Sequence, residues 1–166
     1  MQFGQQLSDF IVESKLVDVS EKTFVEKLYM NEENMNIIGT ATFTPKTWDE
    51  KPYKEMNTGR KLTRVQAVFT YSGDLAAEGT VDYLMAYNPD GTGSFVGLEH
   101  IVGSIGDQVG SFVTQHTGVF DPNSVTYQWE FVPGSGTDGL DGLLGAGDLR
   151  LEGPGPYPFS FNYQID

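Results

Sequence analysis

Two acid–base residues stand side by side in this chain, and a second histidine follows in the next segment of similar pattern. Glu99 and His100 are neighbours in a stretch that alternates apolar and polar residues, and His116 lies in another. Neighbours on a β-strand point to opposite faces, so only one of Glu99 and His100 faces inward, and the pattern leaves open which. In an apolar interior, a carboxylate or imidazole could act as a general acid or base. Glu99, His100 and His116 are therefore the candidate catalytic residues, unless the inward group is only a hydrogen-bonded structural one.

A metal site is the second chemistry that these residues suggest. His116 shares its face with Phe112 and Thr114 and could approach Glu99 or His100, depending on strand register. Two histidines and a carboxylate would suit a divalent metal. However, no ligand-spacing motif brings three or four ligands together. We predict no metal and no cofactor.

Four further side chains are candidates for ligand binding. Tyr83 and Tyr87 share one face of their segment, and Trp129 lies on an aromatic face with Tyr127. Such side chains could shape a pocket inside a barrel. Arg64 lies opposite an apolar face, where it could hold a ligand carboxylate. The alternative for Arg64 is a cross-strand pair with an acidic residue of the following segment.

The Gly-rich stretch 134–139 could be mistaken for a phosphate-binding or nucleophile motif. It lacks the Lys-Ser/Thr ending of a P-loop, and no helical pattern follows it. Ser135 does not complete the five-residue pattern of a nucleophile elbow. We interpret the stretch as a mobile loop over a barrel mouth.

The elements that must position these residues are predicted to be strands. Even spacing, with turn residues between segments, is typical of a sandwich or an up-and-down barrel. An even number of strands lets the first and last pair antiparallel, which removes both edges. The connections 45–60 and 133–144 are predicted to be long. The eight predicted strands are 36–44, 61–71, 77–88, 92–102, 110–119, 125–132, 145–152 and 157–165.

The beginning of the chain has a different pattern. Apolar residues at helical spacing and a capping box at Asp18 predict two short amphipathic helices, 4–16 and 19–30. The predicted organisation is therefore a helical arm over residues 1–34 and an antiparallel β-barrel domain over residues 35–166.

Composition limits the partners and the compartment. A formal net charge of −13 argues against nucleic acid and against anionic membrane surfaces. The 166 residues contain no cysteine, which excludes disulfides and thiolate metal sites. No apolar run is long enough to span a membrane and no secretory signal is visible, so we expect a cytoplasmic protein.

Several short stretches carry a resemblance to a known family. The chain resembles, over about residues 36–166, small bacterial proteins known only as a domain of unknown function, which are similar in structure to allene-oxide-cyclase-like barrels. The resemblance implies a closed antiparallel barrel and a homo-oligomer, and it implies no reaction. The stretches that carry it are Trp48–Tyr53, Leu62–Arg64, Tyr83–Tyr87, Phe95–Glu99, Gly110–His116 and Val132–Thr137.

These observations lead to one expected function and two alternatives. We expect an eight-stranded closed barrel that binds a small, largely apolar ligand in or at its mouth. The first alternative is a cyclase- or isomerase-like enzyme that uses an inward carboxylate or histidine. The second is a non-catalytic oligomeric interaction module, suggested by the excess of Phe and Tyr.

Overall fold

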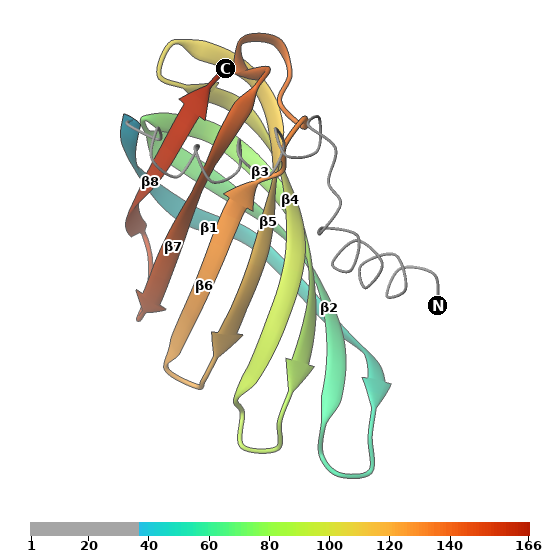
Figure 1. Cartoon of the computed structure of the whole chain (residues 1–166). Coiled ribbons are helices and arrows are strands. Elements are labelled where there is room, and N and C mark those ends of the chain that lie inside the picture. The colour runs from blue at the N-terminus through green and yellow to red at the C-terminus, as the bar shows by residue number, and fades with distance from the viewer. Residues whose placement is uncertain (1–36) are drawn as a thin grey trace, which may run out of the picture. The chain divides into compact units, whose positions relative to one another are not determined.

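Segments of alternating apolar and polar residues form eight antiparallel strands in the computed structural model, which describes residues 37–166 (Figure 1). The strands follow one another around the barrel in sequence order. The helical arm predicted for residues 1–34 lies outside the described residues. The strands are β1 (Ile37–Glu55), β2 (Lys61–Gly73), β3 (Leu75–Tyr87), β4 (Gly93–Ile105), β5 (Gln108–Phe120), β6 (Ser124–Phe131), β7 (Leu143–Glu152) and β8 (Tyr157–Ile165).

The first and last strands close the barrel. The first part of β1 pairs antiparallel with β8, from Ile37 opposite Tyr163 to Phe43 opposite Tyr157. Every other strand pairs with its neighbours in sequence. The predicted all-β, closed, eight-stranded antiparallel barrel is therefore confirmed, and closure leaves no lateral edge strand.

β1 is much longer than the sequence pattern predicts. The stretch 45–60, predicted to be a connection, instead forms the second half of β1 and a tight turn into β2. The pairing with β2 shifts register between Pro45 and Thr47, as in a β-bulge. The bulge changes which residues face the interior: Phe43 faces inward before it, and Trp48 and Glu50 face inward after it. The prediction was wrong here because the bulge interrupts the two-residue period.

The Gly-rich segment after β6 is tied to β5. Thr137 N–H donates to the Ser111 carbonyl, and the Val113 N–H donates to the Ser135 hydroxyl. A 3-10 turn, η2 (Asp138–Leu140), then places Leu140 in the core with none of its surface exposed. The loop predicted to be a mobile lid is thus held by hydrogen bonds and by a buried leucine.

The barrel interior is predominantly aromatic. Phe112 and Phe161 are almost completely buried, and each such side chain contributes about 1.5–3 kcal/mol to folding. The only buried polar side chains among residues 37–166 are Thr63, Glu99, Thr114 and His116. This small polar group in an apolar interior marks the place to look for a site.

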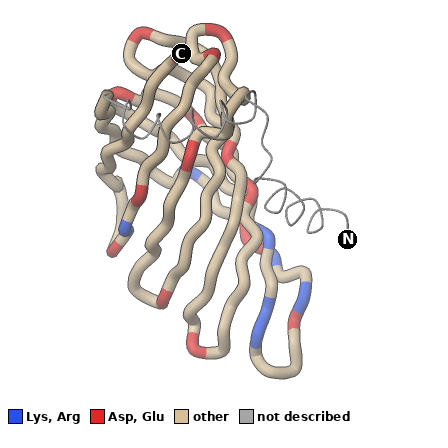
Figure 2. Tube along the Cα trace, viewed as in Figure 1, with Lys and Arg blue, Asp and Glu red and all other residues tan. Residues whose placement is uncertain are grey.

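Charge is unevenly distributed on the barrel (Figure 2). Apart from Arg150, all Lys and Arg residues in the described part of the chain lie on β1, β2 and the turn between them. Within the same residues, no helix has the length and apolarity needed to cross a membrane.

Candidate functional site

Strand alternation on β4 turns Glu99 into the barrel and His100 out of it. Glu99 has none of its surface exposed, whereas His100 is exposed. Phe95 and Ile101 share the inward face with Glu99. His100 therefore takes no part in a catalytic site inside the barrel, because its side chain is on the outer surface.

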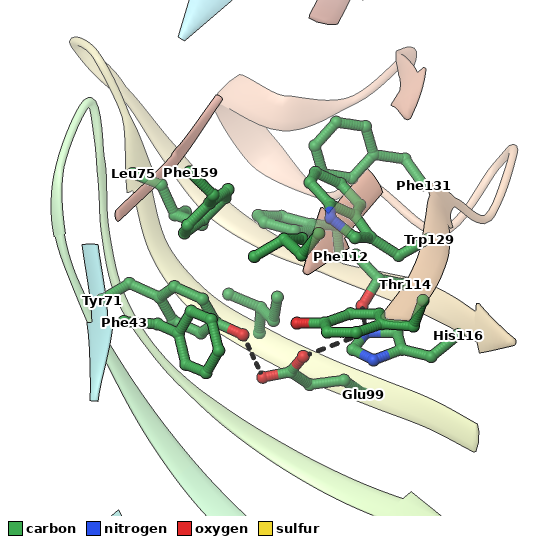
Figure 3. Close-up of a pocket in the computed structure, with 13 residues that line it drawn as sticks. Phe43, Tyr71, Leu75, Glu99, Phe112, Thr114, His116, Trp129, Phe131 and Phe159 are labelled. Atoms are coloured by element: carbon green, nitrogen blue, oxygen red, sulfur yellow. Dashed lines mark hydrogen bonds and ion pairs between the residues drawn. The ribbon is translucent and has the colours of Figure 1, made fainter. Parts of the chain in front are cut away.

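Glu99 and His116 meet in the barrel interior, and Figure 3 shows Glu99 linked to both His116 and Tyr71. Glu99 Oε2 lies 3.2 Å from His116 Nε2, and the Tyr71 hydroxyl donates to Glu99 Oε1 at 2.7 Å. On the other side of the imidazole, Nδ1 lies 2.8 Å from the Tyr83 hydroxyl. His116 Nε2 also lies 2.8 Å from the Thr114 hydroxyl. Side chains from β2, β3, β4 and β5 thus form one connected polar cluster.

One oxygen of this cluster has no hydrogen-bond partner. Glu99 Oε2 is close to His116 Nε2, but the contact lacks the alignment of a hydrogen bond. The Thr114 hydroxyl, which is closer to Nε2, is the better partner of that nitrogen. Among the described residues, Glu99 Oε2 is the only buried side-chain polar atom without a hydrogen-bond partner. Such an atom is costly unless something else pairs with it.

Two inward-facing glycines make room for the cluster. A side chain at Gly79 on β3 would collide with Glu99 Oε1, and one at Gly97 on β4 would collide with the Tyr83 ring. Because Gly97 lies opposite His116 in the β4–β5 register, its missing side chain lets Tyr83 reach across to the imidazole. The glycines therefore allow the side chains of this cluster to pack together.

Burial and charge keep the tyrosines around Glu99 protonated. Burial, followed by the negative charge of Glu99, raises the pKa of Tyr71 well above its ordinary value. The pKa of Tyr83 and that of Tyr127 are raised as well, chiefly by burial. The tyrosines therefore act as neutral hydroxyl groups and not as phenolate bases.

A small cavity lies against this cluster, and we call it the enclosed cavity because nearly all of the side chains that line it are buried (Figure 3). Its volume is about 20 Å³, which is room for about one water-sized group. The walls are aromatic and aliphatic apart from Glu99, Thr114, His116 and the tyrosine hydroxyls. The cavity is lined by Phe43, Tyr71, Leu75, Glu99, Ile101, Phe112, Thr114, His116, Tyr127, Trp129, Phe131, Leu149 and Phe159.

A larger pocket, which we call the mouth pocket, lies toward the barrel end that carries the β3–β4 and β5–β6 turns. Its volume is about 260 Å³, and Asp121 is its only charged lining residue. Phe43 and Tyr127 line both this pocket and the enclosed cavity. The mouth pocket is lined by Phe43, Pro45, Trp48, Phe69, Tyr83, Met85, Phe95, Phe120, Asp121, Val125, Tyr127, Leu151 and Tyr157.

The four candidate ligand-binding residues are distributed over different places. Tyr83 lines the mouth pocket and Trp129 the enclosed cavity. Tyr87 lines neither, although its ring packs against Phe120 with centroids 4.9 Å apart. Arg64 is on the outer surface, where it pairs with Asp82 at 2.7 Å. Arg64 thus forms the cross-strand pair that was the alternative prediction, because it lies on the outward face of β2.

Glu50 is a polar residue that the sequence pattern did not reveal. Its carboxylate accepts hydrogen bonds from Tyr87 at 2.5 Å, Thr63 at 2.7 Å and Trp48 at 3.3 Å. Partial burial opposes its ionisation, but these hydrogen bonds and the charge of Lys61 outweigh it and lower the pKa of Glu50. Sequence reasoning missed this cluster because residue 50 was assigned to a connection.

Sequence reasoning also overlooked Tyr71 and assigned no role to Thr114 or Tyr127. Tyr127 stacks on the His116 ring, with centroids 5.4 Å apart and planes 17° apart. All three residues lie on inward faces, so alternation could have identified them as interior residues. Their contacts with Glu99 and His116 depend on the register of several strands, which alternation does not give.

The arrangement can hold and move a proton, but it is poorly suited to a metal. A carboxylate next to an imidazole is a common acid–base pair. No third His, Cys, Asp or Glu joins Glu99 and His116 in the described part of the chain. A metal site needs more ligands than these two.

Comparisons with known proteins agree with the fold. Residues 39–163 match the model of a family described as "Protein of unknown function (DUF3224)". The chain is similar to the crystal structure of a protein with unknown function from the same family in Shewanella oneidensis MR-1. The two are 28% identical, with a TM-score of 0.64 over 78% of this chain and 98% of that one. No curated protein matches the chain. The resemblance to a family of unknown function is confirmed, and no activity comes with it.

Proposed function

This chain belongs to the DUF3224 family of proteins of unknown function, and from its barrel we propose that it binds a small, largely apolar ligand in the mouth pocket. The single observation that carries the proposal is the mouth pocket itself, with about 260 Å³ of space and predominantly aromatic and aliphatic walls. Ligand sites are typically concave and apolar, with a few polar groups that fix orientation.

The size of the two cavities supports a ligand in the mouth pocket. The enclosed cavity, at about 20 Å³, is too small for the body of any organic ligand. Trp48, which is half exposed, lies at the edge of the mouth pocket with its ring 6.1 Å from that of Tyr83. The body of the ligand therefore belongs in the mouth pocket, against Trp48 and Tyr83.

The test uses the methyl group of Met85 as a reporter, because Met85 lines the mouth pocket. Protein labelled with ¹³C-methyl methionine is titrated with hexanol, a neutral apolar probe. We expect the Met85 methyl resonance to shift with saturation, while that of Met56, in the β1–β2 turn, does not. Absence of a saturable shift at Met85 would refute binding in this pocket.

A pocket-filling variant provides the matched control. Leu151→Trp places an indole in the mouth pocket and should abolish the Met85 shift. Leu84→Trp adds the same indole on the outer face of β3, where Leu84 is half exposed, and should leave the titration unchanged. Equal behaviour of the two variants would show that hexanol binds elsewhere.

The contact between Glu99 and His116 favours a second candidate, an enzyme that transfers a proton to or from the ligand. Such an enzyme should catalyse exchange of a ligand C–H hydrogen with solvent deuterium, which NMR follows directly. We expect Glu99→Gln to abolish this exchange while hexanol still binds in the mouth pocket. Exchange that persists in this variant would remove Glu99 from the mechanism.

A further inference from the structure

The enclosed cavity is lined by the Glu99 carboxylate and by aromatic rings, and one oxygen of this carboxylate accepts no hydrogen bond (Figure 3). The Glu99 side chain is only 1% exposed, and its Oε2 has no hydrogen-bond partner among the described residues. No Lys or Arg lines the cavity. Apart from Arg150, the described basic residues lie on β1, β2 and the turn between them (Figure 2). Residues 37–166 therefore provide no full positive charge for Oε2 other than a protonated His116.

The chemistry of these walls favours a cation with N–H groups. A buried carboxylate oxygen lacks a donor, and a charged donor gives the strongest hydrogen bond to it. Aromatic faces attract cations through their quadrupole, which is how aromatic cages recognise ammonium groups. An anionic group would be repelled by Glu99, and the net charge of −13 adds to that repulsion.

The size of the cavity restricts the cation further. A volume of about 20 Å³ accepts one water-sized group, such as a primary ammonium head, and excludes a trimethylammonium head. Phe43 and Tyr127 line both cavities, so the two cavities are neighbours inside the barrel. The two cavities thus suit the two ends of one molecule.

We propose that the ligand is an apolar primary amine whose ammonium group donates a hydrogen bond to Glu99 Oε2. This inference rests on the proposed function, because the mouth pocket holds the apolar body. It goes further by naming the class of ligand and the residue that selects it. Water could also occupy the enclosed cavity, but water would give no preference for an amine.

The test compares hexylamine with hexanol, which have the same apolar body and differ in the head group. Both are titrated with the Met85 methyl resonance as readout. We expect hexylamine to bind about ten- to a hundredfold more tightly than hexanol, which is the effect of one hydrogen bond to a charged group. Trimethylhexylammonium should lose this advantage because its head is too large and has no N–H donor.

Two variants test whether Glu99 causes the preference for hexylamine over hexanol. Glu99→Gln should bring hexylamine affinity down to that of hexanol while leaving hexanol binding unchanged, which also shows that the variant is folded. Glu78→Gln removes the same charge from the outer surface, where Glu78 pairs with Lys46, and should keep the full preference. A preference that survives Glu99→Gln would overturn the assignment.

The salt dependence of the preference for hexylamine tests the site without any variant. Attraction by surface charges weakens as salt is added, whereas a buried pair is screened much less. We expect the preference for hexylamine to persist at high salt. A preference that disappears with salt, or equal binding of the two probes, would overturn the ammonium site and leave the proposed function standing. Binding of neither probe would overturn both.

Discussion

His116 Nε2 on β5 lies 3.2 Å from Glu99 Oε2 on β4, and both side chains are almost completely enclosed by the barrel. The contact is a diagonal one, because Glu99 is opposite Thr114 and His116 is opposite Gly97 in the strand register. Diagonal neighbours on one face of a sheet are within reach of long side chains. A buried pair of this kind adds little net stability, since desolvation offsets the attraction. The proposed ligand binding and proton transfer would each give this pair a role other than stability.

The Tyr83 hydroxyl and His116 Nδ1 should be energetically coupled. Tyr83→Phe leaves a buried imidazole nitrogen unpaired, and His116→Phe leaves a buried hydroxyl unpaired, so each should cost about 1–3 kcal/mol. The double variant should cost less than the sum, by about 0.5–3 kcal/mol. Urea denaturation of the four proteins measures this difference. As a control, the stability losses of Tyr83→Phe and of Thr80→Ala, on the outer face of β3, should add up in the double variant. If the losses of Tyr83→Phe and His116→Phe also add up, the contact between the two side chains is contradicted.

Alkaline pH should reveal the buried tyrosines. The raised pKa values of Tyr71, Tyr83 and Tyr127 mean that the folded protein keeps protons that the unfolded chain releases. Stability should therefore be constant up to the ordinary tyrosine pKa of about 10 and fall as the pH rises above it. Tyrosinate absorbance measured together with circular dichroism checks this.

The absorbance of these three residues should appear only as the fold is lost. Tyr127→Phe should reduce the amplitude of that late phase. Complete ionisation of all tyrosines while the circular dichroism spectrum remains native would contradict the burial of these hydroxyl groups.

Gly79 should be intolerant of even the smallest side chain. In Gly79→Ala, the added methyl collides with Glu99 Oε1, which can move away only by giving up its hydrogen bond from the Tyr71 hydroxyl. We expect a loss of about 1–3 kcal/mol in the free energy of unfolding, as for other overpacked cores. Thr80→Ala, at the next position but on the outer face, should change stability by less than about 0.5 kcal/mol. Similar effects of the two substitutions would contradict the packing described for Glu99.

Sequence alone predicted the strand number, the antiparallel order and most of the turns. Alternation on β6 and β8 is clear, because aromatic side chains occupy one face and polar ones the other. The turn Asn88–Gly91 lies between β3 and β4 as its Pro and Gly residues indicate. β1 was predicted too short, because the bulge after Pro45 breaks the period and hides Glu50.

The orientation of Glu99 and His100 was harder to predict, for a physical reason visible on β4. The outward face of this strand carries Val96, Leu98 and Val102, each more than half exposed. Both faces of β4 are therefore apolar, and the pattern does not reveal which one is inside. Contacts between residues of different strands, such as Tyr71 with Glu99, require the register, which only the structure provides.

Binding of a small apolar molecule in the mouth pocket can be seen in a crystal structure of the protein grown with hexanol. We expect electron density for the alcohol between Met85, Leu151 and Tyr127. Side chains that close the pocket and leave hexanol only on the outer face of the barrel, near Leu84 and Val96, would refute binding there.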